Sequence, residues 1–81
     1  MPTAHSERGY RFFFYSDEGS PREPRHVHVV RGSGTAKVWL DPTPVLDRSH
    51  GMSRGELREL IGIIMDHADE LRGAWDDHFR S

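Results

Sequence analysis

Residues 24–42 read PRHVHVVRGSGTAKVWLDP, two runs of β-branched and apolar residues on either side of a glycine-rich segment. This pattern predicts two antiparallel strands, 26–31 and 35–40, because glycine supplies the positive φ that a tight turn at 32–34 requires. Side chains alternate between the two faces of a strand. One face then carries the apolar residues Val27, Val29, Ala36, Val38 and Leu40. The other face carries His26, His28, Lys37 and Trp39.

The segments before and after this hairpin differ in character. Residues 10–15, YRFFFY, are dense in aromatic side chains and predict a strand with apolar groups on both faces. Residues 1–9 are polar and predict a flexible arm, and the proline- and glycine-containing residues 16–25 predict a loop. Prolines at 42 and 44 end the last strand. For residues 45–50 two alternatives remain, a short fourth strand or a helical turn.

The C-terminal segment has the pattern of an amphipathic helix. Ser53 and Glu56 have the spacing of a capping box, in which each side chain bonds the other residue's backbone N–H. Apolar residues then recur every three or four positions, at Leu57, Leu60, Ile61, Ile64, Ala68, Leu71, Trp75 and Phe79. The pattern predicts one long helix, and Gly73 favours a bend or break near its own position.

These elements predict an α+β fold: a small antiparallel three- to four-stranded β-sheet with a long C-terminal helix packed across one face. We expect a single domain over residues 10–81, because 81 residues provide little more than one core. The absence of cysteine excludes disulfides, thiolate metal sites and cysteine catalysis. Residues 1–10 contain no apolar run typical of a signal peptide, and no stretch is apolar enough to span a membrane. We therefore expect a cytoplasmic protein that does not bind membranes.

His26 and His28 are the candidate catalytic residues, because an ordinary imidazole titrates near neutral pH and can act as a general acid or base. The alternative is that they are two polar residues on a half-exposed strand. A third ligand from Asp41 or His50 would complete a metal site, but no ligand set has diagnostic spacing. We therefore predict no bound metal and no cofactor, and we expect any chemistry to use the face that carries His26, His28 and Lys37.

Five further residues are candidates for contact with a nucleic acid or a partner: Tyr15, Arg22, Arg25, Lys37 and Trp39. Lys37 and the two arginines are suited to phosphate, and the rings of Tyr15 or Trp39 to base stacking. The alternative for Trp39 is packing against the aromatic strand. For the lysine and the arginines, the alternative is ordinary solvation.

Four motifs in order are similar to one bacterial family, domain of unknown function 4160. They are GYRFFFYS at 9–16, PRHVHV at 24–29, AKVWLDP at 36–42, and a final helix that begins SRGEL at 53 and ends with Ala74 and Trp75. The similarity covers residues 9–79. The resemblance implies a small protein often encoded beside another, of domain of unknown function 2442, in a toxin–antitoxin-like pair. It supplies no catalytic residues.

Two functions from different classes follow. The first is a protein-binding component of a toxin–antitoxin-like pair, whose partner is a small cognate protein encoded nearby. The second is a toxin-like, metal-independent ribonuclease that uses His26 or His28, since RNA supplies its own 2′-OH nucleophile. The net charge of −2 argues against a general polyanion binder and favours the first. The sequence does not decide whether the chain is an enzyme, and it is compatible with a homo-oligomer.

Overall fold

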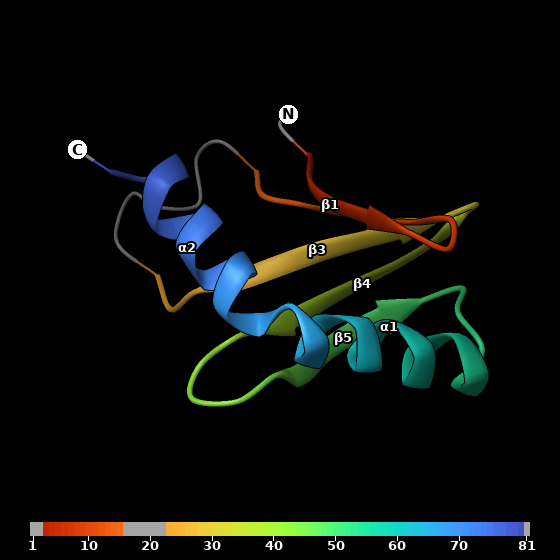
Figure 1. Cartoon of the computed structure of the whole chain (residues 1–81). Helices are drawn as coiled ribbons and strands as arrows, with labels where there is room; N and C mark the ends of the chain where they lie inside the picture. Colours follow the sequence, from red (N-terminus) through yellow and green to blue (C-terminus); the bar gives the residue numbers. More distant parts are fainter. Residues whose placement is uncertain (1–2, 16–22, 81) are drawn as a thin grey trace.

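The computed structural model describes residues 3–15 and 23–80. Within these residues the chain forms five strands and then two helices (Figure 1). The strands are β1 (Thr3–Glu7), β2 (Tyr10–Phe13), β3 (His26–Arg31), β4 (Gly34–Trp39) and β5 (Val45–His50). The helices are α1 (Arg54–Asp66) and α2 (Ala68–His78). This architecture confirms the α+β class.

The strands form one antiparallel sheet in the order β1-β2-β3-β4-β5, so each strand pairs with the next along the chain. The predicted central hairpin is confirmed, with Val27 opposite Val38 and Arg31 opposite Gly34. Gly32 has a positive φ of 59° in its turn. Gly34 has no room for a side chain, because a Cβ there would lie 2.7 Å from Met52 Cγ and 2.8 Å from the Gly51 carbonyl oxygen.

The described part of the chain has five strands, where the sequence predicts three to four. Residues 3–7, predicted to belong to a flexible arm, form edge strand β1 beside β2. The turn between them is possible because Arg8 and Gly9 both adopt positive φ, 52° and 83°. Residues 45–50 form the opposite edge strand, so the strand is the correct alternative there. Its pairing with β4 is irregular between Lys37 and Val38.

The prediction of one long helix is also wrong, because two helices follow the sheet. Helix α1 begins at the predicted capping box, in which Ser53 Oγ accepts from Glu56 N–H at 3.1 Å and Glu56 Oε1 accepts from Ser53 N–H at 2.9 Å. It ends at His67, whose φ of −119° and ψ of 19° are not helical. Gly73 lies inside α2, not at a break. Neither helix is long and apolar enough to cross a membrane.

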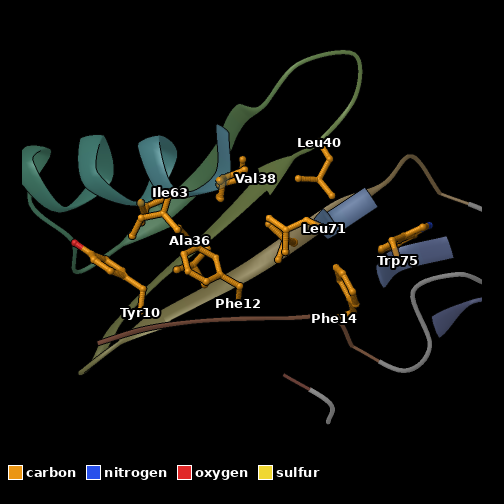
Figure 2. Close-up of a cluster of buried hydrophobic side chains, with 13 residues drawn as sticks. Tyr10, Phe12, Phe14, Ala36, Val38, Leu40, Ile63, Leu71 and Trp75 are labelled. Carbon is orange, nitrogen blue, oxygen red and sulfur yellow. The ribbon is translucent and has the colours of Figure 1, made fainter. Parts of the chain in front are cut away.

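The break lets α2 leave the direction of α1 and cover the end of the sheet where β3 begins (Figure 1). Trp75 of α2 packs edge-on against Phe14, with ring centroids 5.5 Å apart. Between the helices and the sheet lies the core (Figure 2). Its buried residues are Tyr10, Phe12, Phe14, Val27, Val29, Ala36, Val38, Leu40, Leu60, Ile63, Ile64, Leu71 and Trp75. The predicted apolar face of β3 and β4 is therefore the face that the helices cover.

Truncation of the α1 core residues should destabilise the fold strongly. Leu60 and Ile64 are fully buried, so Leu60→Ala or Ile64→Ala should lower the free energy of unfolding by about 2–5 kcal/mol, through lost burial and the cavity left behind. Met65 is 60% exposed on the same helix, and Met65→Ala is the matched control that should change stability little. Chemical denaturation measures all three. Equal stability of Leu60→Ala, Ile64→Ala and wild type would contradict this packing.

Candidate functional site

Both helices lie on one side of the sheet (Figure 1). The opposite face carries polar side chains of the strands together with the aromatic residues Phe13, Tyr15 and Trp39. The register aligns one row across four strands: Phe13 is opposite His28, His28 opposite Lys37, and Lys37 opposite Arg48. We call this surface the open face. It is defined by Arg11, Phe13, Tyr15, His28, Thr35, Lys37, Trp39, Arg48 and His50. Among the described helices, none covers the centre of this row.

His28 lies in the middle of the open face and is half-buried. Its ring lies 4.4 Å from that of Tyr15 and 5.8 Å from that of Phe13, measured between centroids. Phe13 and Tyr15 in turn pack edge-on at 5.3 Å. These aromatic contacts hold the imidazole in one orientation on a rigid strand.

Lys37 is directly opposite His28 on β4. Its Nζ lies 4.4 Å from the centroid of the Trp39 ring, a cation–π contact, and 4.0 Å from Asp47 Oδ2. Arg48 Nη1 approaches the same carboxylate oxygen at 3.6 Å. Two cations therefore share a single carboxylate at the centre of the open face.

A shallow concavity of about 250 Å³ lies beside this row. Its lining consists of Tyr15, His28, Thr35, Ala36, Lys37, Arg48, Ser49 and His50. Four of the lining side chains, those of His28, Lys37, Arg48 and His50, are basic, and none is a carboxylate. The concavity is therefore suited to an anionic group, a carboxylate or a phosphate, that hydrogen-bonds to Lys37 or Arg48.

His26 does not lie open beside His28 as the strand alternation predicts. Its side chain is 0% exposed. Its ring lies 5.3 Å from that of His28, 5.3 Å from Trp39 and 4.9 Å from Trp75 of α2. The prediction that neither histidine meets the helices is thus wrong for His26, because α2 extends past the end of β3. His28 is the imidazole of the pair that lines the concavity.

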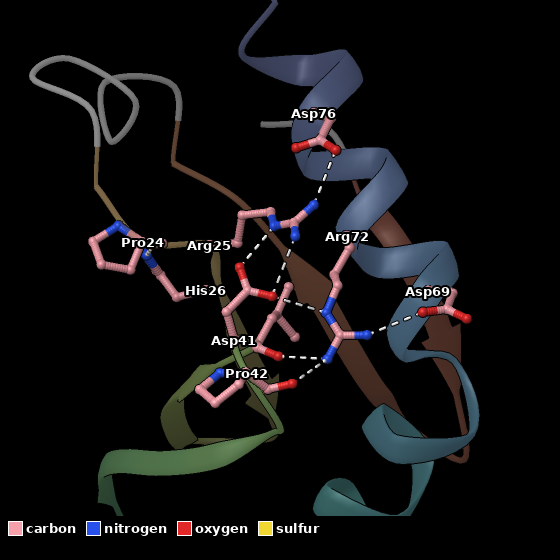
Figure 3. A network of polar contacts seen from close by, with 9 residues as sticks. Pro24, Arg25, His26, Asp41, Pro42, Asp69, Arg72 and Asp76 are labelled. Atoms are coloured by element: carbon pink, nitrogen blue, oxygen red, sulfur yellow. Dashed lines mark hydrogen bonds and ion pairs between the residues drawn. The ribbon is translucent and has the colours of Figure 1, made fainter.

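Of the two candidate arginines of the loop before β3, only Arg25 lies among the described residues, and it does not join the open face. Arg22 lies outside the described residues. Arg25 donates from Nε to Asp41 Oδ2 at 2.7 Å and from Nη1 to Asp76 Oδ2 at 3.0 Å (Figure 3). Its guanidinium is therefore engaged by two carboxylates, one after β4 and one on α2.

Asp41 is the centre of this polar network (Figure 3). Arg72 of α2 donates to Asp41 Oδ1 at 3.0 Å and to the carbonyl oxygens of Leu40 at 2.7 Å and Pro42 at 3.2 Å. The hydrogen bond from Arg25 is the largest influence on Asp41 and holds the pKa of its carboxyl below the usual range. The network fixes α2 against the end of β4 and so keeps Trp75 beside His26.

The comparison with protein families matches residues 9–76 to the family described as Domain of unknown function (DUF4160). The chain belongs to this family. The DUF4160 match spans β2 to β5, α1 and most of α2, and so includes every residue of the open face. The search of curated proteins and the search of solved structures found no match.

Arg48 and His50 are also open-face residues of this DUF4160 protein; the sequence analysis did not identify Arg48, and it named His50 only as a possible metal ligand. His50 is opposite Thr35, and Arg48 is opposite Lys37. The positions of Arg48 and His50 on the open face therefore depend on the pairing of β5 with β4. The sequence signal for their shared position is that Arg48 and His50 are two residues apart, as side chains on one face of a strand are. It has meaning only if this segment is a strand, and the sequence left that question open.

Asp41→Asn should weaken the attachment of α2 to the sheet. It removes the charge that two guanidinium groups bind, which costs about 1–3 kcal/mol of unfolding free energy at pH 7. Because folding lowers the pKa of Asp41, its contribution is complete above the unfolded pKa of roughly 3.9 and is lost as pH falls through the lower folded value. The stability difference between wild type and Asp41→Asn should therefore shrink in acid.

Urea denaturation from pH 7 to pH 2.5 measures this difference. Asp77→Asn is the control, since Asp77 pairs with Arg80 at 2.7 Å and both side chains are exposed, so that this ion pair contributes little to stability. A difference for Asp41→Asn that is constant across this range would contradict the assigned role.

Proposed function

We propose that this chain is the protein-binding component of a two-protein, toxin–antitoxin-like pair, and that its open face binds the partner. The observation that carries the proposal is the row His28–Lys37–Arg48 on a sheet face whose centre no described helix covers. The row combines a rigid strand scaffold with cations and aromatic rings. This is the composition of residues that dominate protein interfaces.

The charges of the open face indicate the chemistry of the partner. Arg11, Lys37 and Arg48 contribute three cations, against one carboxylate from Asp47. Exposed apolar area accompanies them, since Tyr15 is 41% exposed and Val45, on edge strand β5, is 54% exposed. We infer a small protein that presents acidic side chains around an apolar contact, because complementary charge steers association and selects the partner.

Two observations favour a protein over a nucleic acid. The chain has a net charge of −2, whereas affinity for nucleic acids depends on many cations that neutralise phosphates. Base stacking also needs an accessible ring face. Trp39 is half-buried with Lys37 Nζ over its ring, and Phe13 is buried, which leaves Tyr15 as the one exposed aromatic ring among the described residues of the open face.

Charge reversal on the open face should weaken the complex. Arg48→Glu places an acidic group at the centre of the proposed contact, so we expect binding to the product of an adjacent gene to weaken about tenfold or more. Arg58→Glu makes the same change at an exposed position of α1 and should leave the affinity unchanged. Isothermal titration calorimetry measures both. No complex, or equal weakening by both variants, would contradict the proposal.

A metal-independent ribonuclease is the second candidate, and one specific observation favours it. His28 and Lys37 are opposite each other on paired strands beside the anion-suited concavity. In this mechanism His28 takes the proton of a ribose 2′-OH as that oxygen attacks the adjacent phosphorus. The bond from phosphorus to the 5′-oxygen of the next nucleotide breaks, so that a 2′,3′-cyclic phosphate forms and the 5′-oxygen leaves with a proton from water or from the imidazolium. Lys37 and Arg48 stabilise the charge that develops on the phosphate oxygens. Because His26 is buried, this candidate mechanism uses His28 alone as the catalytic imidazole.

If this second function is correct, His28→Ala should reduce cleavage of single-stranded RNA by about 10²–10⁴-fold. His78→Ala removes an imidazole from α2, outside the open face, and should retain activity. A chelator should have no effect on wild type or variant. Absence of cleavage by the wild-type chain, or activity that persists in His28→Ala, would refute this candidate and leave the binding function as the proposal.

A further inference from the structure

Four ionisable side chains from opposite ends of the chain meet on the helix side of the sheet. His5 and Glu7 belong to edge strand β1, His67 is the residue at which α1 ends, and Glu70 lies in the first turn of α2. The rings of His5 and His67 lie 4.1 Å apart between centroids. The side chain of His67 makes no capping hydrogen bond to α2 and takes part in this cluster instead.

Glu7 contacts the Nε2 atom of each imidazole. Its Oε1 lies 2.9 Å from His5 Nε2 and 3.2 Å from His67 Nε2. An ionised carboxylate has no hydrogen to donate, so Glu7 is the acceptor in both contacts. A neutral imidazole that donates from Nε2–H has its lone pair on Nδ1. Glu7 therefore directs both Nδ1 lone pairs away from itself.

Both Nδ1 atoms approach Glu70. Glu70 Oε2 lies 3.7 Å from His5 Nδ1 and 3.9 Å from His67 Nδ1. When both imidazoles are neutral and donate from Nε2–H, the two Nδ1 atoms and Glu70 Oε2 are three acceptors, and none of them carries a hydrogen to donate to the others. One potential ligand atom from each of the three residues lies within 4.8 Å of the others. Tetrahedral zinc, with bonds of roughly 2.0–2.1 Å, needs its ligand atoms about 3.4 Å apart. Glu70 can reach this separation by a small movement, because its side chain is 61% exposed.

We propose that His5 Nδ1, His67 Nδ1 and a carboxylate oxygen of Glu70 bind one zinc ion. Two imidazoles and one carboxylate are a ligand set that zinc uses in proteins, with water in the fourth position. Glu7 holds both Nε2–H groups, the arrangement by which a second carboxylate orients histidine ligands and raises their basicity. Bound zinc ties the N-terminal edge strand to the junction of the two helices. The proposed site is separate from the open face, and it departs from the sequence-based prediction of no bound metal.

The first measurement is zinc binding by the untagged wild-type chain, by isothermal titration calorimetry and native mass spectrometry. We expect one zinc ion per chain and a rise in Tm on its addition. We also expect zinc to shift the imidazole NMR signals of His5 and His67. Absence of 1:1 binding, or imidazole shifts confined to His26 and His28, would overturn the proposal whatever the variants do.

Variants then assign the ligands. His67→Gln should abolish the 1:1 complex, and Glu7→Gln should weaken it by roughly 10–100-fold, the usual effect of removing an outer carboxylate. His50→Gln removes an imidazole from β5 and should bind zinc as the wild type does. Circular dichroism confirms that each variant is folded. Wild-type affinity in folded His67→Gln, or an equal loss in His50→Gln, would overturn the assignment.

Discussion

The whole structure depends on one constraint: α1 and α2 can cover only one face of the sheet. The large apolar side chains of both helices point to that face, where Leu60, Ile64 and Leu71 are fully buried against Val29 and Val38. Little apolar material is left for the second face. Strands β3, β4 and β5 therefore carry a row of imidazole, ammonium and guanidinium groups on that face instead of a second core.

Buried or half-buried polar contacts fix where each helix lies. The Tyr10 hydroxyl donates a hydrogen bond to Glu59 Oε1 of α1 at 2.9 Å. The pKa of Tyr10 is raised, first by burial and second by this hydrogen bond. Arg72 attaches α2 to Asp41 and to two carbonyl oxygens after β4. Between these attachments the chain leaves the helical conformation at His67. This break has two results, since it brings Trp75 over His26 and His67 beside His5.

The strongest local signals in the sequence correspond to what the structure contains. The glycine turn and alternating residues of 24–40 predict the β3–β4 hairpin, and the capping box predicts the start of α1. Strand β1 was not predicted, because it is polar, and for β5, which follows two prolines, the sequence left a strand and a helical turn as alternatives; tertiary pairing makes both segments strands. The break at His67 is likewise set by packing at the sheet end. Strand alternation places His28 and Lys37 correctly, but it cannot show that α2 buries His26, or that His5 meets His67 from the far end of the chain.

Single-cysteine labelling tests the one-sided covering of the sheet most directly, because the chain has no cysteine of its own. Thr35 and Ala36 are neighbours on β4, one exposed on the open face and the other buried beneath the helices. In the native protein a thiol reagent should modify Thr35→Cys at the rate of a free thiol, and Ala36→Cys only through unfolding, at a rate that rises with urea. Similar protection of both cysteines, or faster labelling at position 36, would contradict the account.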